Sequence, residues 1–306
     1  MLWEETFGSQ LEKFLRKEQF IFHAPMREHT TFKIGGEADL LIFPSSAEEV
    51  SRVFKLVELF SLPCVILGNG SNVLVRDKGI RGVVVKFTEK FFGGMRCEGQ
   101  RLIACAGAKL KDVATFAAEN GLTGLEFACG IPGSIGGAIF MNAGAYDSEM
   151  KNTVASVKAV TRDGEFVEFS GSALDLHYRH SIFQDNSHAI AEVTLRLFSG
   201  EGETIRVKME DLTRRREEKQ PLEMPSAGST FKRPTGYFAG TLIDQTGLKG
   251  LKVGGAQVST KHAGFVVNTG NATANDVLNL IEEVKRRVFE AHGVKLFPEV
   301  RIIGEE

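Results

Sequence analysis

Cys64-Val65-Ile66-Leu67-Gly68-Asn69-Gly70-Ser71-Asn72 is an apolar run that ends in a loop with two glycines. A short apolar run bounded by such a loop is typical of a buried strand. Glycines let backbone N–H groups converge on a bound phosphate, and serine and asparagine side chains add donors. The loop Gly68–Asn72 therefore predicts a cradle for a nucleotide pyrophosphate. The alternative is a tight turn that needs a positive φ.

Two common phosphate-binding patterns do not fit this loop. No Gly-Lys-Ser/Thr follows it, which excludes the Walker type. No third glycine opens a helix after it, which excludes the G-x-G-x-x-G fingerprint.

A second glycine-rich stretch, Gly130–Ala138, lies further along the chain. Because proline favours a first helical turn, we expect a helix to begin near Pro132 and to point free N–H groups at an anion. Adjacent glycines would let a flat group lie against the backbone. The alternative is close helix packing through small residues. Two such loops without a phosphate-binding lysine favour a dinucleotide cofactor, and the candidate cofactor-binding residues are Gly68, Asn69, Gly70, Ser71, Asn72, Gly133, Ser134, Gly136 and Gly137.

The elements around these loops indicate three units, with boundaries at 1–85, 86–200 and 201–296. Residues 297–306 can pack either on the first unit or on the third. In the first unit we expect a helix over 4–19, a strand over 39–43, a helix opened by a Ser46/Glu49 capping box, and strands at 64–67, 73–75 and 82–85. In the second we expect a helix over 109–120, a hairpin at Asp163-Gly164 and a strand over 193–197. In the third we expect a helix ending near Lys219, a last helix capped by Thr273 and Asp276 and closed by Gly293, and short strands on both sides of 297–299.

Composition indicates an ordinary globular enzyme-sized chain. It has 306 residues, of which 42% are hydrophobic and 25% charged, with a net charge of -2. That balance argues against a general nucleic-acid binder, which normally carries a basic face. The acidic N-terminus argues against a signal peptide, and no apolar stretch of about 18 residues predicts a membrane span. We expect a cytoplasmic protein that is a monomer or a weak oligomer.

The four cysteines, Cys64, Cys97, Cys105 and Cys129, form no C-x-x-C pair. No cysteine or histidine spacing resembles a zinc site, so we predict no metal. Reduced thiols are expected, with disulfides as the minor alternative.

Ser229 is the first candidate for chemistry. It lies in Pro225-Ser226-Ala227-Gly228-Ser229-Thr230-Phe231-Lys232-Arg233-Pro234, behind small residues and in front of two cations. No G-x-S-x-G elbow surrounds it, which disfavours a hydrolase nucleophile. A serine can donate a proton if its alkoxide is stabilised, and Lys219, Lys232 and Arg233 are candidates for that role.

Glu299 and Arg179 are the other candidates. Glu299 is flanked by apolar residues, where desolvation favours the protonated carboxyl form and suits general-acid support. Arg179, next to Tyr178, could grip a carboxylate in a bidentate way. The alternatives are an exposed strand-edge glutamate and a surface ion pair. His177 and His180 are interpreted as solvated or structural, and Arg214-Arg215-Arg216 as a solvated helix face.

These motifs together resemble the UDP-N-acetylenolpyruvoylglucosamine reductase family. The resemblance runs almost end to end, over the segments 30–36, 68–72, 130–146, 178–183, 228–234, 261–268 and 298–301. It implies an α+β fold: a two-subdomain FAD-binding module of the vanillyl-alcohol-oxidase (PCMH) type, followed by a C-terminal α/β substrate-binding domain. It also implies a role in peptidoglycan synthesis, and hence in cell wall biogenesis, cell shape and cell division.

The resemblance further implies a reaction and roles for the candidate residues. NADPH would reduce non-covalent FAD, and the hydride would pass to the enolpyruvyl group of the UDP-sugar. Ser229 would protonate the resulting intermediate, Arg179 and Glu299 would stabilise it, and Lys219 and Arg233 would bind substrate. Arg233 and His262 differ from some family members, and no tyrosine-bearing loop lies between Ser181 and Ala189, so the chain is similar to the shorter subtype.

Two other functions stay open at this point. The first is another oxidoreductase on the same FAD scaffold; the lack of histidine in both glycine loops disfavours the covalent flavin that many of those carry. The second is a flavin or nucleotide sensor, which would need the loops but neither Ser229 nor Glu299.

Overall fold

The apolar run before the first glycine loop is strand β3 (Cys64–Leu67) in the computed structural model, which describes residues 2–306. Its contacts divide the chain into two units. The first unit runs up to Phe22 and comprises Leu40–Asn69 and Gly82–Arg214 as well. The second unit comprises His23–Asp39, Gly70–Arg81 and Arg215–Glu306. The division into three domains at residues 85 and 200 stays a proposal.

The first sheet has the strand order β1-β2-β5-β3. It contains β1 (Phe20–Pro25), β2 (Glu37–Ile42) and β5 (Ile80–Lys86), and β3 runs parallel to β5. Helix α2 (Ala47–Leu59) follows β2, and Ser46 caps it by accepting a 3.2 Å hydrogen bond from the Glu49 N–H. The Glu49 carboxylate instead accepts the backbone N–H of Ser45 at 2.6 Å, so only half of the predicted capping box forms.

The predicted helix over 4–19 is wrong beyond its middle. Helix α1 (Leu2–Leu11) ends early, and a short 3₁₀ helix, η1 (Lys17–Gln19), precedes β1. Arg16 is extended, with φ -78° and ψ 156°, because the Gln19 side chain accepts its backbone N–H at 3.1 Å. This local hydrogen bond competes with helix continuation.

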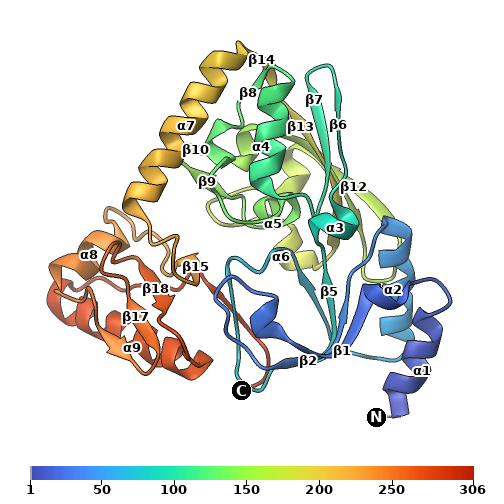
Figure 1. Ribbon diagram of the computed structural model, residues 1–306, viewed down its shortest axis with the longest axis horizontal. Coiled ribbons are helices and arrows are strands. Elements are labelled where there is room, and N and C mark those ends of the chain that lie inside the picture. Colours follow the sequence, from blue (N-terminus) through green and yellow to red (C-terminus); the bar gives the residue numbers. More distant parts are fainter. Residues whose placement is uncertain (1) are drawn as a thin grey trace. The chain divides into compact units, whose positions relative to one another are not determined.

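A second, antiparallel sheet has the order β12-β11-β13-β7-β6 (Figure 1). Gly164, at φ 84°, lies in the predicted hairpin between β11 and β12. Helix α5 contacts β13 and β7. The bounds are β6 (Met95–Glu98), β7 (Arg101–Cys105), β11 (Val154–Val160), β12 (Phe166–Ser170), β13 (Ala189–Arg196), α4 (Leu110–Glu119) and α5 (Ile135–Phe140).

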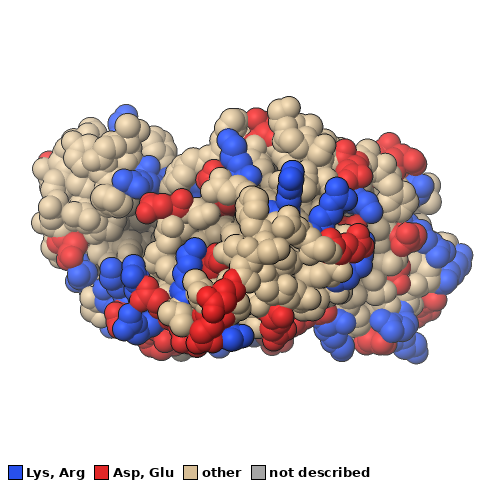
Figure 2. Space-filling view, turned by 90° about the horizontal axis from the view of Figure 1, so that it is seen from above, with Lys and Arg blue, Asp and Glu red and all other residues tan. Residues whose placement is uncertain are grey.

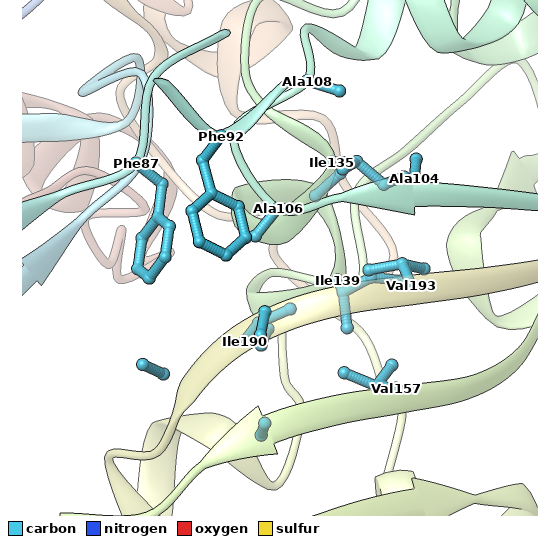
Figure 3. Close-up of a cluster of buried hydrophobic side chains, with 14 of the residues drawn as sticks. Phe87, Phe92, Ala104, Ala106, Ala108, Ile135, Ile139, Val157, Ile190 and Val193 are labelled. Carbon is cyan, nitrogen blue, oxygen red and sulfur yellow. The ribbon is translucent and has the colours of Figure 1, made fainter. Parts of the chain in front are cut away.

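The core of the first unit is made by aromatic and small apolar side chains together (Figure 3). Phe87 and Phe92 meet edge to face, with ring centroids 5.0 Å apart. Alanines of β7 and of the segment after it let helix α5 pack closely, through Ile135 and Ile139. Shorter elements complete this unit: α3 (Glu89–Phe92), β8 (Leu122–Thr123), β9 (Gly144–Ala145), β10 (Ser148–Glu149), α6 (Phe183–Asn186) and β14 (Phe198–Ser199).

The second unit has a sheet of order β15-β18-β17-β16 beside helix α9. Thr273 and Asp276 form the predicted capping box of α9 (Ala274–His292), and Gly293 ends it at φ 68°. The apolar stripe of α9 is buried, as its spacing predicts. The other bounds are β15 (Ser226–Ser229), α8 (Ala239–Gln245), β16 (Lys252–Val253), β17 (Ala256–Val258) and β18 (Phe265–Asn268).

The last strand pairs with a segment far upstream. β19 (Arg301–Ile303) runs parallel to β4 (Val73–Val75). A strand before residue 297 was also expected, and that expectation is wrong. Proline lacks an N–H and joins ladders poorly, and Pro298 makes only an isolated bridge with Phe231.

Charged side chains are mixed in sign over the face seen in Figure 2, as the small net charge predicts. Helix α7 (Gly202–Lys219) ends where predicted, before Pro221. Among the described residues, no helix combines the length and hydropathy that a membrane crossing requires.

Candidate functional site

The two glycine loops meet within the first unit. A Cβ added to Gly68 would lie 2.5 Å from the Oγ of Ser134, closer than any ordinary contact. Ser134 itself is buried. The absence of a side chain at Gly68 therefore lets the end of strand β3 approach the second loop closely.

The second loop uses its amides internally. The N–H groups of Ile135 and Gly136 donate to the carbonyls of Ala108 and Ala106, at 2.9 and 3.0 Å. Ser134 caps helix α5 by accepting the Gly137 N–H at 3.4 Å. The helix thus begins at Ile135 rather than near Pro132, and the predicted presentation of free N–H groups by its first turn is wrong.

Close packing explains Gly136. Its added Cβ would lie 2.9 Å from the Ala106 Cβ, so this glycine lets helix α5 touch the segment after β7. The alternative reading of small residues as packing residues holds at this position. Gly137 differs, because its added Cβ would meet the Ser134 Oγ at an ordinary 3.5 Å.

The rest of the first loop lies in the second unit and is tied to strand β15. Gly70 has φ 69°, and its carbonyl accepts the Thr31 N–H at 3.2 Å. The Thr31 hydroxyl donates to the Ser226 carbonyl at 2.7 Å. Thr31 thus connects the glycine loop to the strand that carries Ser229, a role that its position in the sequence did not reveal.

Ser229 and Glu299 lie in neighbouring backbone segments of the second unit. The Glu299 N–H donates to the Thr230 carbonyl at 2.8 Å, and the Lys232 N–H donates to the Phe297 carbonyl at 2.8 Å. Ser229 is exposed and Glu299 is half-buried. Main-chain hydrogen bonds thus hold the segments of the two predicted proton-handling residues side by side. The side chains of Ser229 and Glu299 are not needed for this arrangement.

Asn72 extends this frame to the end of the first glycine loop. Its side-chain amide donates to the Glu299 carbonyl at 3.3 Å, and its own carbonyl accepts the Arg301 N–H at 3.0 Å. Three motifs from distant parts of the sequence, around residues 72, 229 and 299, therefore share one framework.

Arg179 lies at the tip of a two-residue turn in the first unit. His177 and His180 exchange backbone hydrogen bonds of 3.2 and 3.1 Å, and Arg179 between them has φ 57°. The Arg179 carbonyl accepts the Gln184 side-chain amide at 2.9 Å, and the guanidinium lies 5.0 Å from the Tyr178 ring centroid. A left-handed backbone conformation at a non-glycine residue costs free energy, and it is kept here by the surrounding hydrogen bonds. Such strain favours a functional role for Arg179 over that of a surface ion pair.

The predicted substrate-binding cations are both exposed. Lys219 is the last residue of helix α7, and the Arg233 guanidinium stacks 3.9 Å over the Phe238 ring. Arg214 pairs with Asp211 at 2.6 Å on its own helix, which favours the solvated-face reading for that residue.

Lys86 is a residue that the sequence analysis missed. It ends strand β5 opposite Leu67, the residue before Gly68, and its side chain is 8% exposed. Burial lowers the pKa of the Lys86 amine to about 8. A buried lysine cannot be recognised from an apolar run that simply ends in lysine.

The polar side chains of the first loop suit the groups of FAD. Gly68 and Gly70 let neighbouring protein segments pack closely, since a Cβ on Gly70 would lie 2.7 Å from the His29 carbonyl oxygen. This close packing fixes the backbone of the loop. Asn69, Ser71 and Asn72 add polar donors for the phosphate or ribose groups of a dinucleotide.

Two families of known proteins match successive parts of the chain. A family described as "FAD binding domain" matches residues 38–170, and one described as "UDP-N-acetylenolpyruvoylglucosamine reductase, C-terminal domain" matches residues 220–303. The first region contains the contact between Gly68 and Ser134, and the second contains Ser229 and Glu299.

Similar proteins cover nearly the whole chain. A Clostridium botulinum protein named UDP-N-acetylenolpyruvoylglucosamine reductase is 51% identical over 99% of this chain and 98% of its own length. One of the same name from Syntrophomonas wolfei is 48% identical over 97% of this chain and 99% of its own. The crystal structure of the Thermus caldophilus enzyme of that name superposes with a TM-score of 0.79 at 36% identity, covering 94% of this chain and 98% of that one.

Proposed function

Since the chain belongs to the UDP-N-acetylenolpyruvoylglucosamine reductase family, we propose that it uses NADPH to reduce UDP-N-acetylenolpyruvoylglucosamine to UDP-N-acetylmuramate. It is an FAD-dependent oxidoreductase with the expected α+β fold, an FAD-binding region followed by the family's C-terminal domain. The choice of NADPH, the residue roles and the cytoplasmic location are parts of the proposal.

The observation that carries the proposal is the main-chain bond between Glu299 and Thr230. It keeps a carboxyl-bearing segment next to the segment of Ser229, so that a hydroxyl and a carboxyl group belong to one rigid frame. A reaction that adds a proton to carbon needs such a positioned donor. FAD, when bound, supplies the hydride chemistry by accepting a hydride from NADPH and delivering it to the substrate.

Ser229 donates the proton in this proposal. Hydride addition to the enolpyruvyl methylene carbon leaves negative charge on the adjacent carbon and its carboxylate. The Ser229 hydroxyl protonates that adjacent carbon and becomes an alkoxide. Glu299, whose backbone is held by the Thr230 bond, lowers the cost of that alkoxide from the neighbouring segment.

Arg179 stabilises developing negative charge on the substrate. A guanidinium gives paired donors to a carboxylate, and a fixed turn spares reorganisation during reaction. Lys219 and Arg233 bind the anionic substrate in the same proposal, which both exposed positions permit.

Gly68, Asn69, Gly70, Ser71, Asn72, Gly133, Ser134 and Gly137 are proposed to hold FAD non-covalently, while Gly136 serves packing. Support comes from the close approach of Gly68 to Ser134. The protein is proposed to act as a monomer or a weak oligomer, with no nucleic-acid partner.

Two half-reactions test the proposal. Anaerobic mixing with NADPH should bleach the flavin absorbance, and addition of the enolpyruvyl-UDP-sugar should restore it in one turnover. If NADPH bleaches the flavin but only oxygen or simple sugars restore it, the protein is a different flavin oxidoreductase and the substrate assignment is wrong.

A further inference from the structure

The turn that carries Arg179 places two imidazoles on one face. His177 and His180 form an isolated antiparallel bridge, and residues opposite each other in such a pair share a face. Their ring centroids lie 6.1 Å apart with the planes 17° from parallel. The sequence spacing alone, with Tyr178 and Arg179 between them, does not show this arrangement.

Two carboxylates converge on these rings. The Asp175 oxygens lie 2.8 Å from the His177 Nε2 and 3.2 Å from the His180 Nε2. An Asp185 oxygen lies 3.5 Å from the same His180 nitrogen. One ligand atom each from Asp175, His180 and Asp185 thus falls within 4.8 Å of the other two.

A single proton on His180 cannot bond to both carboxylates that face it. The His180 Nε2 faces two carboxylates, but a ring nitrogen carries only one N–H to donate. A divalent cation can bind all of these atoms at once and offset both negative charges. Zinc bonds to nitrogen and oxygen of about 2.1 Å place tetrahedral ligand atoms about 3.4 Å apart. The observed 3.2 and 3.5 Å separations from His180 fit that geometry.

The surrounding backbone holds the cluster in place. Asn142 donates its side-chain amide to the His177 carbonyl at 2.9 Å, and Ser181 donates its hydroxyl to the Phe140 carbonyl at 2.8 Å. The side chains of His177 and Asp185 are 66% and 62% exposed, so an ion can enter from solvent. These bonds fix the backbone of the turn, so only the side chains remain for the ion to order.

We propose that Asp175, His180 and Asp185 form a Zn²⁺ site, with His177 as the fourth ligand once it turns from Asp175 to the ion. Two imidazoles select zinc and similar transition metals over magnesium and calcium, which prefer oxygen ligands only. The site would join the residues before and after Tyr178-Arg179, and would so brace the turn. The expectation of no metal rested on cysteine and histidine spacing, and it did not consider aspartates brought in by a turn.

Zinc titration of the flavin-loaded, chelator-treated protein tests the proposal by calorimetry, without substrate or NADPH. Its outcome is therefore independent of the proposed reductase function. The expected result is one more equivalent of tightly bound Zn²⁺ in the unaltered protein than in His180→Ala. Asp185→Asn, an exposed change that should leave folding intact, should weaken that site by tenfold or more.

His292→Gln is the matched control. This exposed histidine is the last residue of α9, and its Nε2 lies 3.1 Å from the Thr246 hydroxyl oxygen. Loss of the His292 imidazole should leave the tight site unchanged. Zinc should raise the melting temperatures of this variant and of the unaltered protein by the same amount. Equal zinc stoichiometry and affinity in the unaltered protein, Asp185→Asn and His180→Ala would overturn the proposal.

Discussion

The backbone N–H of Glu299 donates a 2.8 Å hydrogen bond to the carbonyl oxygen of Thr230, the residue after Ser229. The bond does not depend on either side chain that the proposed chemistry uses. Ser229 and Glu299 can therefore be altered singly without removing the framework, which makes kinetic tests at both positions interpretable.

Ser229→Ala should separate the two half-reactions. Flavin reduction by NADPH should continue at its normal rate, because no proton needs to be delivered to carbon in that step. Reoxidation by the enolpyruvyl substrate should slow by about 10²- to 10⁴-fold, the usual worth of general acid catalysis. Stopped-flow absorbance of the flavin measures both rates.

Ser226→Ala is the matched control, because it removes a hydroxyl from the same strand but keeps the carbonyl that Thr31 binds. Both half-reactions should survive in it. An equal loss of both half-reactions in Ser229→Ala would remove the proton-donor assignment.

Glu299→Gln keeps the size and the backbone bonds of the residue but cannot give up or hold a proton as a carboxyl group does. Substrate-driven reoxidation should fall by about 10²-fold or more, and the melting temperature should change little. Glu305→Gln, at an exposed carboxylate near Arg81, should leave the rate unchanged. Normal reoxidation in Glu299→Gln would assign this carboxyl group a structural role only.

Gly68→Ala should weaken flavin binding. The new methyl group would lie 2.5 Å from the Ser134 Oγ, so the two loops must move apart. Adding Ser134→Ala removes that oxygen and should recover part of the affinity. Fluorescence titration with FAD measures the change, and Gly94→Ala, whose methyl group would meet Cys105 Sγ at an ordinary 3.6 Å, is the control. Unchanged affinity in Gly68→Ala would count against the paired-loop cradle.

Asp77→Ala should destabilise the second unit. The Asp77 carboxylate accepts the N–H groups of Ala274 and Asn275 at 2.7 and 3.0 Å, which places a negative charge at the start of helix α9. Loss of such a cap costs about 1–2 kcal/mol. Urea unfolding followed by circular dichroism measures the loss, and Asp77→Asn should cost less because the amide oxygen still accepts.

Lys86→Met should alter the pH dependence of stability. Below pH 8 both folded and unfolded chains hold the Lys86 proton, and the folded chain bears the full cost of the buried charge. Between its folded pKa of about 8 and its unfolded pKa of about 10.4, only the folded chain releases it, so stability rises with pH. The shift corresponds to roughly 3 kcal/mol at most.

Lys86→Met should therefore be more stable than the unaltered apoprotein at pH 7, and the difference should shrink near pH 10. Denaturant melts at both pH values measure it. Lys111→Met, at an exposed position of helix α4, should show no such trend. A pH-independent difference for Lys86→Met would mean that the buried amine does not titrate as stated.

Local signals in the sequence predict those parts of this fold that depend on neighbours along the chain. The Thr273/Asp276 box and Gly293 bound helix α9, and Asp163-Gly164 lies in a hairpin, because caps and turns are made within a few residues. The first helix was expected to continue to residue 19, because its hydrophobic spacing continues. Hydrophobic spacing does not reveal the hydrogen bond from the Arg16 N–H to the Gln19 side chain, which competes with a helical backbone there.

Contacts between residues that are far apart in the chain could not be predicted from the sequence. Gly136 reads as a ligand-facing glycine until Ala106 is found 2.9 Å from its added Cβ. Thr31 lies in a segment that carries the family resemblance but was given no role there, and its role depends on Ser226. Lys86 belongs to no motif, and its position matters through Leu67. Ser229 and Glu299 could be selected as candidates from their flanking residues, but their shared frame could not.

The parallel pairing of β19 with β4 has a consequence for how the protein is made. Asn72 and Glu299 are 227 residues apart, yet their hydrogen bond belongs to the frame of the candidate site. During translation, the glycine loop and the Ser229 strand are synthesised well before residues 299–303. The hydrogen bonds that join Asn72 and Thr230 to this last segment can form only after it has been made. Because contacts of such sequence separation form late and slowly, the nascent chain can acquire its other elements before it acquires a complete reaction centre.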